Sequence, residues 1–465
     1  MADKPHEACG VFGIYAPGED VARIAYFAIY TLQHRGQESA GIAAGDGEDI
    51  KLHARMGLVS QVFTEEDLAR LRGKVAIGHN RYSTTGSSKI LNAQPMLAHG
   101  PEGTIALGHN GNLVNTASLR AEMTAEGYRF ATTTDTELIT QLFANSPGSG
   151  WTERIRAAMR RMRGAYSLAA MTKDALYAVR DPWGVRPLSI GILKGHWVVA
   201  SETCALDTIG AEFVRDVEPG EIVRVDEHGL HSEVGLPIRR HALCVFEFIY
   251  FARPDSVIDG RLLYLAREEM GRRLAREYPV DADIVIGIPD SATAAGIGYA
   301  QESGIRFTEG LIKSRYIGRT FIQPEQRLRE VGINLKFNAM PGVLRGKRVV
   351  VVDDSIVRGT TTRPMVRLLR RAGAREVHVR ISSPPYSHPC VLGVDTARKG
   401  ELIAARMGVP EIEKFIEADS LGYLSRRGLL QAIGLPSEDF CQACFTGDYP
   451  MPVPPEADKL VLERK

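Results

Sequence analysis

The hydrophobic positions of this chain follow two different patterns, and the pattern changes after about residue 260. In the first part, short apolar runs are separated by turn residues, as in DPWG (181–184) and EPGE (218–221). This pattern is typical of strands joined by tight turns. The runs that predict strands cover residues 75–83, 104–111, 166–171, 175–180, 188–193, 196–201 and 221–226.

Only a few segments of the first part have helical spacing. A helix is predicted at residues 21–32, because its apolar residues recur on one face; these are Val21, Ile24, Ala25, Ala28 and Leu32. A second helix is predicted at residues 135–144, with Asp135 at the N-cap position. The first part is therefore expected to be an antiparallel sheet structure packed with helices.

The second part alternates strands with helices. The strand-like runs IVIGI (284–288) and RVVVV (348–352) each lead into a helical segment, and VHVRI (377–381) follows. This alternation predicts βαβ units and a parallel sheet. We place the boundary between two domains near GLPIRR (235–240).

Composition narrows the function classes. The chain has 465 residues and a net charge of +1, so nothing in its charge favours a nucleic acid or a membrane surface as partner. No apolar run approaches the ~18 residues of a transmembrane helix. The first twenty residues lack the apolar core of a secretory signal.

Six cysteines are too few for a disulfide framework and fit a reducing cytoplasm. The basic segment 151–164 carries an apolar stripe, which favours a solvated helix.

The stretch VVVVDDSIVRGTTT (349–362) has the most specific chemistry. It predicts a buried strand that ends in Asp353 and Asp354, at the edge where open α/β sheets bind ligands. The loop that follows offers hydroxyls and backbone N–H groups at the start of a helix, which suits a phosphate monoester. Paired carboxylates beside such a loop suit a sugar phosphate, whose hydroxyls or metal ion they can bind.

This stretch closely resembles the phosphoribosyl-pyrophosphate (PRPP) motif of the type I phosphoribosyltransferases. IGIPDSATAAGIGYA (286–300) agrees, with Asp290 and Ser291 placed to cap a helix and meet pyrophosphate or its Mg²⁺, and 311–338 resembles the loop that closes over PRPP. The resemblance implies PRPP contacts at Asp290, Ser291, Lys313, Asp353, Asp354, Ser355, Arg358, Gly359, Thr360 and Thr361. It implies Mg²⁺ ligands at Ser291, Asp353 and Asp354.

Cys9, in HEACGVFGIY (6–15), allows two interpretations. It is either a small buried core residue or a nucleophile that becomes residue one when Met1 to Ala8 are removed. Four further segments favour the second interpretation: LQHRGQESAGI (32–42), GHNRYSTTG (78–86), GHNGNLVN (108–115) and TTTDTE (132–137). In this order after CGVFGI they strongly resemble the class II glutamine amidotransferases, over roughly residues 9–230.

The resemblance assigns each residue a role. Cys9 would be the nucleophile, Arg81 would bind the glutamine α-carboxylate and Asp135 its α-ammonium. Asn110 and the Gly111 N–H would form the oxyanion hole. An α-amine titrates near ~7.7–8.0, so a freed Cys9 amine can take the thiol proton at neutral pH. A preorganised oxyanion donor contributes on the order of 3–4 kcal/mol.

Together the two halves resemble the glutamine PRPP amidotransferase family over essentially the whole chain. The resemblance implies a propeptide at 1–8, an α+β N-terminal nucleophile (Ntn) hydrolase αββα sandwich at 9–235 and an α/β type I phosphoribosyltransferase domain at 236–465. Glutamine and PRPP would give 5-phosphoribosylamine, the first step of purine synthesis. Homotetramers and inhibition by purine nucleotides are also implied. CVFEFIYFARPDS (244–256) matches the family's interdomain segment, with Tyr250 and Arg253 in signalling or ammonia passage.

The remaining cysteines point to a metal group. Cys441 and Cys444 have a two-residue spacing that fits a redox pair, a zinc half-site or a cluster half-site. Cys244 and Cys390 are the further candidates. In the precursor-made subset of the family, matching cysteines hold a [4Fe–4S] cluster, so the resemblance implies these four as its ligands. Such a cluster would tie the C-terminal segment to the interdomain strand. Cys204 has no partner pattern and is predicted to be core.

Two other functions remain open from the sequence. A different class II amidotransferase, acting on fructose 6-phosphate or aspartate, would share the Cys9 half, but residues 349–362 argue against it. A non-catalytic protein that senses PRPP or nucleotides would not need the set formed by Cys9, Arg81, Asn110 and Asp135.

Overall fold

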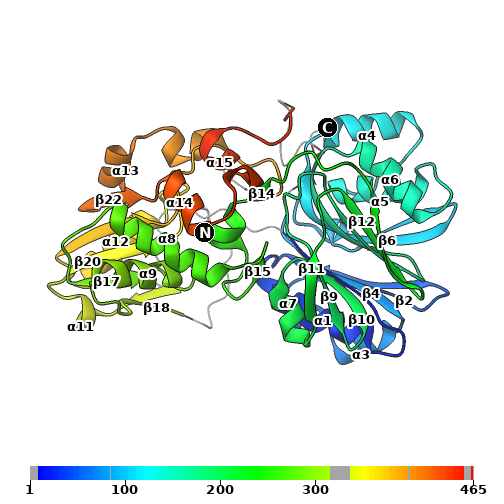
Figure 1. The fold of residues 1–465 in the computed structure, drawn as a ribbon, viewed down its shortest axis with the longest axis horizontal. Coiled ribbons are helices and arrows are strands. Elements are labelled where there is room, and N and C mark those ends of the chain that lie inside the picture. The colour runs from blue at the N-terminus through cyan, green and yellow to red at the C-terminus, as the bar shows by residue number, and fades with distance from the viewer. Residues whose placement is uncertain (1–8, 84, 315–335, 396–397, 455–461, 464–465) are drawn as a thin grey trace.

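The first half of the molecule is a sandwich of two antiparallel sheets (Figure 1). The computed structural model describes residues 9–83, 85–314, 336–395, 398–454 and 462–463. One sheet has the order β11 (Glu212–Asp216), β9 (Ser189–Leu193), β10 (His196–Ala200), β1 (Gly10–Tyr15), β4 (Val75–Arg81), β2 (Ser39–Gly45) and β3 (Ile50–Met56). The other has the order β13 (Gly229–Val234), β12 (Glu221–Asp226), β8 (Leu176–Arg180), β7 (Gly164–Met171), β6 (Gly103–Leu113) and β5 (Met96–Gly100).

Helices cover the outer face of each sheet, which gives the predicted αββα order (Figure 1). The first sheet carries α1 (Val21–Thr31), α2 (Val59–Val62), α3 (Glu65–Arg70) and α7 (Thr203–Ile209). The second carries α4 (Thr116–Ala125), α5 (Asp135–Asn145) and α6 (Trp151–Arg161). Apolar side chains from both sheets, such as Ile77 and Leu176, fill the space between them. Because both faces of each sheet are covered, most strand positions are buried.

The predicted strands and helices of this half are confirmed, with one correction. The helix at α5 begins at Asp135, and its N-cap is Thr134, whose hydroxyl accepts a hydrogen bond from the Thr136 N–H at 3.4 Å. Asp135 is instead the first helical residue. Its side chain turns inward and is 2% exposed. Asp135 therefore does not cap the helix, and its carboxylate faces the candidate site.

The second half is built on a parallel sheet, as predicted. Its order is β17 (Ile284–Gly287), β20 (Arg348–Asp353), β21 (Glu376–Ile381) and β22 (Ser420–Tyr423). From β17 the chain passes through α9 (Thr293–Ser303) to a parallel bridge at Phe307 on one side, whereas α12 (Thr362–Arg371) links β20 to β21 on the other. Right-handed crossovers in opposite directions place α9 and α12 on opposite faces.

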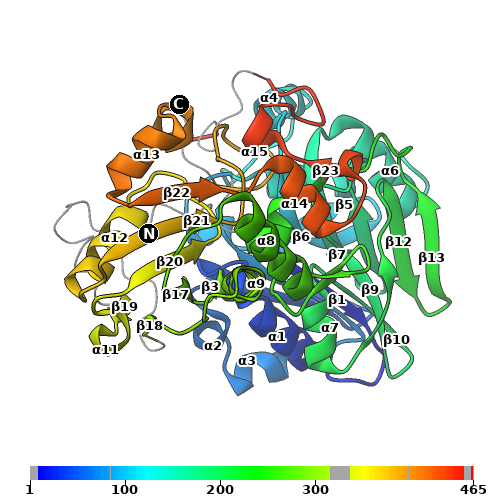
Figure 2. The ribbon, with the colours of Figure 1, turned by 60° about the vertical axis from the view of Figure 1, so that its left-hand side comes forward.

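Further elements surround this sheet. α8 (Leu263–Glu277) packs on α9 and on α14 (Arg426–Ile433), as Figure 2 shows, and α13 (Val409–Ile416) packs beside α12. The smaller elements are β15 (Val257–Ile258), β16 (Arg261–Leu262), β18 (Leu311–Lys313), β19 (Phe337–Ala339), α11 (Pro341–Leu344), a π-helix at Glu247–Phe251 and 3₁₀ turns at Leu32–His34, Ile90–Asn92, Lys399–Glu401, Ile403–Ala405 and Ser437–Asp439.

The C-terminal segment returns to the junction between the halves. There β14 (Leu243–Cys244) pairs in parallel with β23 (Phe440–Cys441), and α15 (Ala443–Thr446) follows. The proposed propeptide, residues 1–8, and most of the predicted PRPP loop, 315–335, lie outside the described residues. The domain boundary at 235–240 stays a prediction. Within the described ranges, no helix is both long and apolar enough to cross a membrane.

Candidate functional site

Cys9 lies at the open end of β1, buried between the two sheets. The antiparallel pairing of β1 with β4 sets Gly10 opposite Asn80, which brings Cys9 beside Tyr82. The Cys9 Sγ donates to the Tyr82 carbonyl at 3.3 Å, and the Tyr82 N–H lies 3.4 Å from the sulfur. Burial raises the pKa of the thiol to about 11. In the uncut chain the sulfur is therefore a neutral thiol at neutral pH and needs a nearby base to attack a carbonyl.

Arg81 lies at the end of β4, adjacent to Cys9, and is 1% exposed. Its guanidinium donates to the carbonyls of Ser87 and Thr85 at 3.2 Å each. Burial lowers the pKa of this guanidinium. The guanidinium also lies 3.7 Å from Glu38 Oε2. A buried guanidinium of this kind can bind a carboxylate ligand.

Glu463, near the end of the chain, reaches the same loop. Its Oε1 accepts from the Ser87 N–H at 2.6 Å and from the Thr133 hydroxyl at 3.0 Å. This contact could not be predicted from the sequence, because Ser87 and Glu463 are 376 positions apart.

Asn110 is fully buried in β6, and neither its Nδ2 nor its Oδ1 has a hydrogen-bond partner among the described residues. A buried amide without partners is costly and is expected where a ligand supplies the missing bond. Gly111 follows with φ +152°, and a Cβ there would lie 2.0 Å from the Ala165 carbonyl oxygen. A side chain at residue 111 is therefore excluded.

Asp135 faces the same space from the start of α5. Its Oδ2 accepts from the Leu113 N–H at 2.9 Å, and its Oδ1 lies 3.7 Å from the His109 Nδ1. Burial opposes ionisation, but His109 and these hydrogen bonds outweigh it and hold the pKa of Asp135 below its usual value. The structure thus assembles an anion for an ammonium group, a cation for a carboxylate, a thiol and a buried amide.

A buried ionic network behind Cys9 was not predicted from the sequence. The Arg35 Nε donates to the Cys9 carbonyl at 3.2 Å, and its Nη2 donates to Glu247 at 2.7 Å. Glu247 begins the π-helix of the interdomain segment and also lies 2.9 Å from Arg186. Arg35 also pairs with Glu202, which is fully buried. The backbone of Cys9 is therefore tied to the segment that joins the two halves.

The two interdomain residues singled out in the sequence occupy different positions. The Arg253 side chain pairs with Asp255 at 2.9 Å, and the Arg253 backbone N–H donates to Glu202 at 2.8 Å. Tyr250 is half-buried in the π-helix and stacks edge-on against Phe251. Arg253 is thus connected to the network through its backbone and not through its guanidinium.

The candidate PRPP site lies at the carboxyl end of β20. Asp353 and Asp354 are 7% and 1% exposed. Asp353 accepts from the Asp354 N–H at 2.9 Å, and Asp354 accepts from the Ser355 hydroxyl at 2.7 Å. Gly359 has φ +75°, and Thr360 and Thr361 lead into α12. The strand, the acidic pair and the loop are arranged as predicted.

The second PRPP segment lies next to it, because β17 and β20 pair in parallel. The predicted capping role of Asp290 and Ser291 is wrong, since α9 begins after Ala292 and has no side-chain cap. Asp290 is instead exposed and pairs with Lys313 at 2.5 Å. This pair joins two of the predicted PRPP contacts. Arg358 pairs with Glu401 at 2.6 Å.

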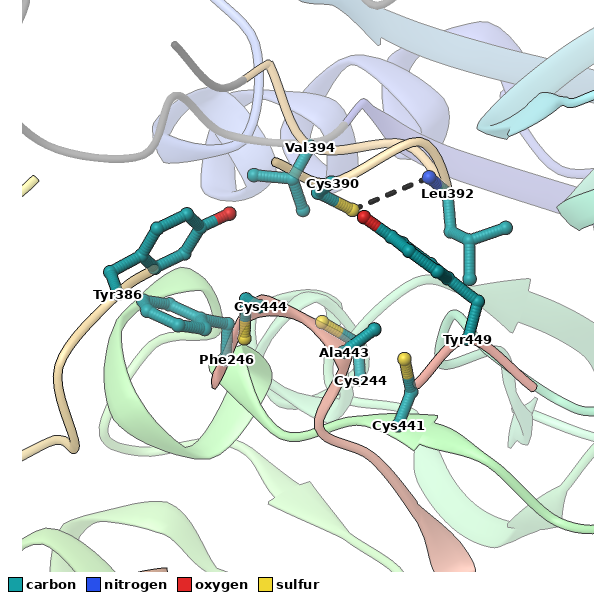
Figure 3. A pocket seen from close by; sticks show the side chains of 10 residues that line it. All are labelled: Cys244, Phe246, Tyr386, Cys390, Leu392, Val394, Cys441, Ala443, Cys444 and Tyr449. Carbon is teal, nitrogen blue, oxygen red and sulfur yellow. Dashed lines mark hydrogen bonds between the residues drawn. The ribbon is translucent and has the colours of Figure 1, made fainter. Parts of the chain in front are cut away.

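The four remaining candidate cysteines converge from three separate segments. Cys244 on β14 is paired in register with Cys441 on β23, Cys444 lies in α15, and Cys390 follows β21. Figure 3 shows their sulfur atoms around one cavity, which is also lined by Phe246, Tyr386, Leu392, Val394, Ala443 and Tyr449. All six cysteines of the chain are free of disulfides, and Cys204 is core, as predicted.

The donor set of this cavity fits an iron–sulfur cluster, which four cysteine thiolates bind. Burial raises the pKa of each of the four thiols, that of Cys244 to about 12. They are therefore neutral until a metal displaces their protons. No group of three or more His, Cys, Asp or Glu side chains in the described ranges is arranged around a single metal ion. The four thiols share one cavity.

The fold and the two sites define a class of protein: a glutamine amidotransferase of the N-terminal cysteine type joined to a phosphoribosyltransferase. The family models agree. A glutamine amidotransferase domain matches residues 79–208 and a phosphoribosyl transferase domain matches residues 258–382.

Full-length relatives identify the family. The chain is 54% identical to the amidophosphoribosyltransferase of Synechococcus elongatus over 99% of this chain and 95% of that protein. It is 51% identical to that of Mycobacterium tuberculosis over 98% and 88%. A solved structure of the glutamine PRPP amidotransferase from B. subtilis, complexed with ADP and GMP, is 47% identical with a TM-score of 0.91, covering 96% of this chain and 98% of that one. The chain belongs to the amidophosphoribosyltransferase family.

Proposed function

We propose that this chain converts glutamine, water and PRPP into 5-phosphoribosylamine, glutamate and pyrophosphate, the first step of purine synthesis. The observation that supports it most strongly is the presence of both sites in one chain that is about half identical to amidophosphoribosyltransferases over nearly its whole length. A thiol beside an arginine, an aspartate and an unpartnered amide suits an amino-acid amide, and the acidic pair with its loop suits a sugar phosphate.

In the proposed first step, Cys9 is freed by removal of residues 1–8, and its α-amine takes the thiol proton. An α-amine titrates near ~7.7–8.0, so it can do this at neutral pH, although burial raises the pKa of the thiol in the uncut chain. The sulfur attacks the glutamine amide and forms a carbon–sulfur bond. Asn110 and the Gly111 N–H stabilise the oxyanion. The α-amine then returns its proton to the amide nitrogen, and ammonia leaves as the carbon–nitrogen bond breaks and the thioester forms. Water then hydrolyses the thioester to glutamate.

Arg81 and Asp135 orient glutamine in this scheme. Arg81 binds the α-carboxylate and Asp135 the α-ammonium, so an amide without an amino-acid head is not positioned. In the second step, the ammonia passes inside the protein to the parallel sheet. There its nitrogen bonds to C1 of PRPP as the bond from C1 to the pyrophosphate oxygen breaks.

Asp353, Asp354, Ser355, Arg358, Gly359, Thr360, Thr361, Asp290, Ser291 and Lys313 are the proposed PRPP contacts. Mg²⁺ would be held by Asp353, Asp354 and Ser291, hard oxygen donors of the kind this ion prefers, and when bound it neutralises charge on the leaving pyrophosphate. A [4Fe–4S] cluster would be held by Cys244, Cys390, Cys441 and Cys444. It would fasten β23 and α15 to the interdomain segment.

The proposal extends to the regulation, the assembly and the cellular setting of this chain. The B. subtilis relative was solved with ADP and GMP, so we propose purine nucleotides as inhibitors of this chain. We also propose a homotetramer and a reducing, cytoplasmic setting, in which six free thiols are stable.

One experiment tests the proposal. The full chain is purified without oxygen, and its intact mass and iron and sulfide content are measured. Pyrophosphate release is then followed with PRPP plus either glutamine or ammonia. Cys9→Ala should abolish synthesis from glutamine and leave synthesis from ammonia. If processed, metal-loaded wild type releases no pyrophosphate with either nitrogen source, the proposed function is wrong.

A further inference from the structure

The loop of residues 390–393, which carries the candidate ligand Cys390, also touches the candidate oxyanion hole. We propose that this 390–393 loop positions the glutamine site, so that a metal group held at the four cysteines controls glutamine use. The inference rests on the proposed function of Asn110, Gly111 and Arg81. Three contacts support it.

The first contact is steric. Gly393 has φ +102°, and a Cβ added there would lie 2.9 Å from both the Cα and the carbonyl carbon of Gly111. Gly111 is also confined on the side away from Gly393. A Cβ added at Gly111 would lie 2.0 Å from the Ala165 carbonyl oxygen. The backbone of the proposed oxyanion hole is therefore held between β7 and the 390–393 loop. If Gly393 moves, Gly111 is free to move with it.

The second contact is a hydrogen bond that continues to Arg81. The Asn112 Nδ2 donates to the Val391 carbonyl at 3.0 Å. The Asn112 Oδ1 accepts from the Thr85 hydroxyl, and the Thr85 carbonyl accepts from Arg81 at 3.2 Å. One side chain thus connects the 390–393 loop to the residue that is proposed to bind the glutamine carboxylate.

The third contact is apolar. Leu392 is 2% exposed and packs with Val114 and Ala165, which flank the oxyanion strand. The same cluster includes Cys244, Cys390 and Cys441. The Leu392 N–H also lies 3.3 Å from the Cys390 sulfur (Figure 3). Leu392 therefore lies between the cysteine cavity and the oxyanion strand and contacts residues of both.

Gly393→Ala tests the steric contact, and Gly229→Ala is its matched control. Gly229 has nearly the same backbone angle, φ +99°, but nothing lies within 4 Å of its added Cβ. We expect Gly393→Ala to lower kcat with glutamine by about 10²-fold, the effect of moving a reacting group by about 1 Å. The ammonia-dependent rate and the KM for PRPP should stay within twofold of the control. Equal loss with both nitrogen sources would overturn the inference.

Asn112→Ala is the second variant, because it adds no atoms and removes the two hydrogen bonds that join the 390–393 loop to Thr85, one to the Val391 carbonyl and one from the Thr85 hydroxyl. It should also lower glutamine-dependent turnover while sparing ammonia-dependent turnover. A variant that keeps full glutamine turnover contradicts the proposed link. If wild type itself does not use glutamine, the proposed function fails and not this inference.

Metal retention gives a readout independent of turnover. Coupling between two sites is reciprocal, so occupying the glutamine site should slow the loss of metal. Wild type and both variants are treated with a diazoketone analogue of glutamine that alkylates Cys9, and iron release to a chelator is then timed. Labelling should slow release at least several-fold in wild type and have no effect in Asn112→Ala. Equal release rates with and without the label in wild type would refute the coupling.

Discussion

A substitution at Asn110 should separate an effect on catalysis from an effect on stability most clearly. It is fully buried, and both polar atoms of its amide lack protein partners among the described residues. Replacing Asn110 with Ala therefore breaks no hydrogen bond of the folded chain. We expect this change to reduce glutamine turnover and to spare the fold.

The expected sizes follow from these contacts. Losing one oxyanion donor lowers kcat by about 10²–10³-fold, or about 3–4 kcal/mol. Removing an unpartnered buried amide relieves a desolvation cost of about 1–3 kcal/mol. The small cavity left behind offsets this relief. The free energy of unfolding of Asn110→Ala should thus stay within about 1 kcal/mol of wild type.

Asn80→Ala is the matched control, since Asn80 is equally buried on the neighbouring sheet. Its Oδ1 has no partner among the described residues, but its Nδ2 donates to the Ile29 carbonyl. Asn80→Ala therefore loses a buried hydrogen bond and should cost about 0.5–1.5 kcal/mol more than Asn110→Ala. Urea unfolding measures the stability of both variants, and glutamate release measures amide hydrolysis. The reasoning is refuted if Asn110→Ala is destabilised as much as Asn80→Ala, or if it hydrolyses glutamine at the wild-type rate.

Three further predictions concern other parts of the molecule. Asp353→Asn should lower synthesis from glutamine and from ammonia by the same factor, about 10²-fold, in a pyrophosphate assay; loss with glutamine alone would contradict a role at PRPP. Glu247→Gln should cost about 3–5 kcal/mol in urea unfolding, because it leaves Arg35 and Arg186 without a shared buried carboxylate, whereas Glu65→Gln at the surface should leave the midpoint unchanged. In the uncut chain, alkylation of Cys9 by iodoacetamide should rise with pH up to about 11, since only the thiolate reacts and burial raises the pKa of this thiol to that value; peptide mass mapping that shows a plateau below pH 9 would rule this out.

The sequence predicted the secondary structure well where the pattern is local. The seven predicted strands of the first half and the helices α1 and α5 follow from spacing, because burial leaves a direct trace in the order of apolar residues. The strands β2, β3, β5, β11 and β13 were not predicted. The acidic pair after β20 and the four cysteines could also be predicted, since each lies in a short motif of distinctive composition. The capping role predicted for Asp290 was wrong, because that side chain pairs with Lys313, which is 23 positions away.

The buried network could not be found from the sequence at all. Arg35 and Glu247 are 212 positions apart, and a single arginine or glutamate on an apolar segment has no local signature. The contacts of Asn112 and Gly393 could not be predicted from the sequence either, because they depend on how the two domains pack. Pairings of this kind are set by tertiary structure, which spacing along one chain does not encode.

The position of the 390–393 loop also bears on how the protein is made. Chains fold domain by domain as they leave the ribosome, N-terminal part first. The antiparallel sandwich is fully synthesised well before residue 390 emerges, yet Gly111 and Asn112 still lack their neighbours Gly393 and Val391 at that stage. A nascent chain therefore lacks these contacts to the proposed oxyanion hole until the phosphoribosyltransferase half has been translated.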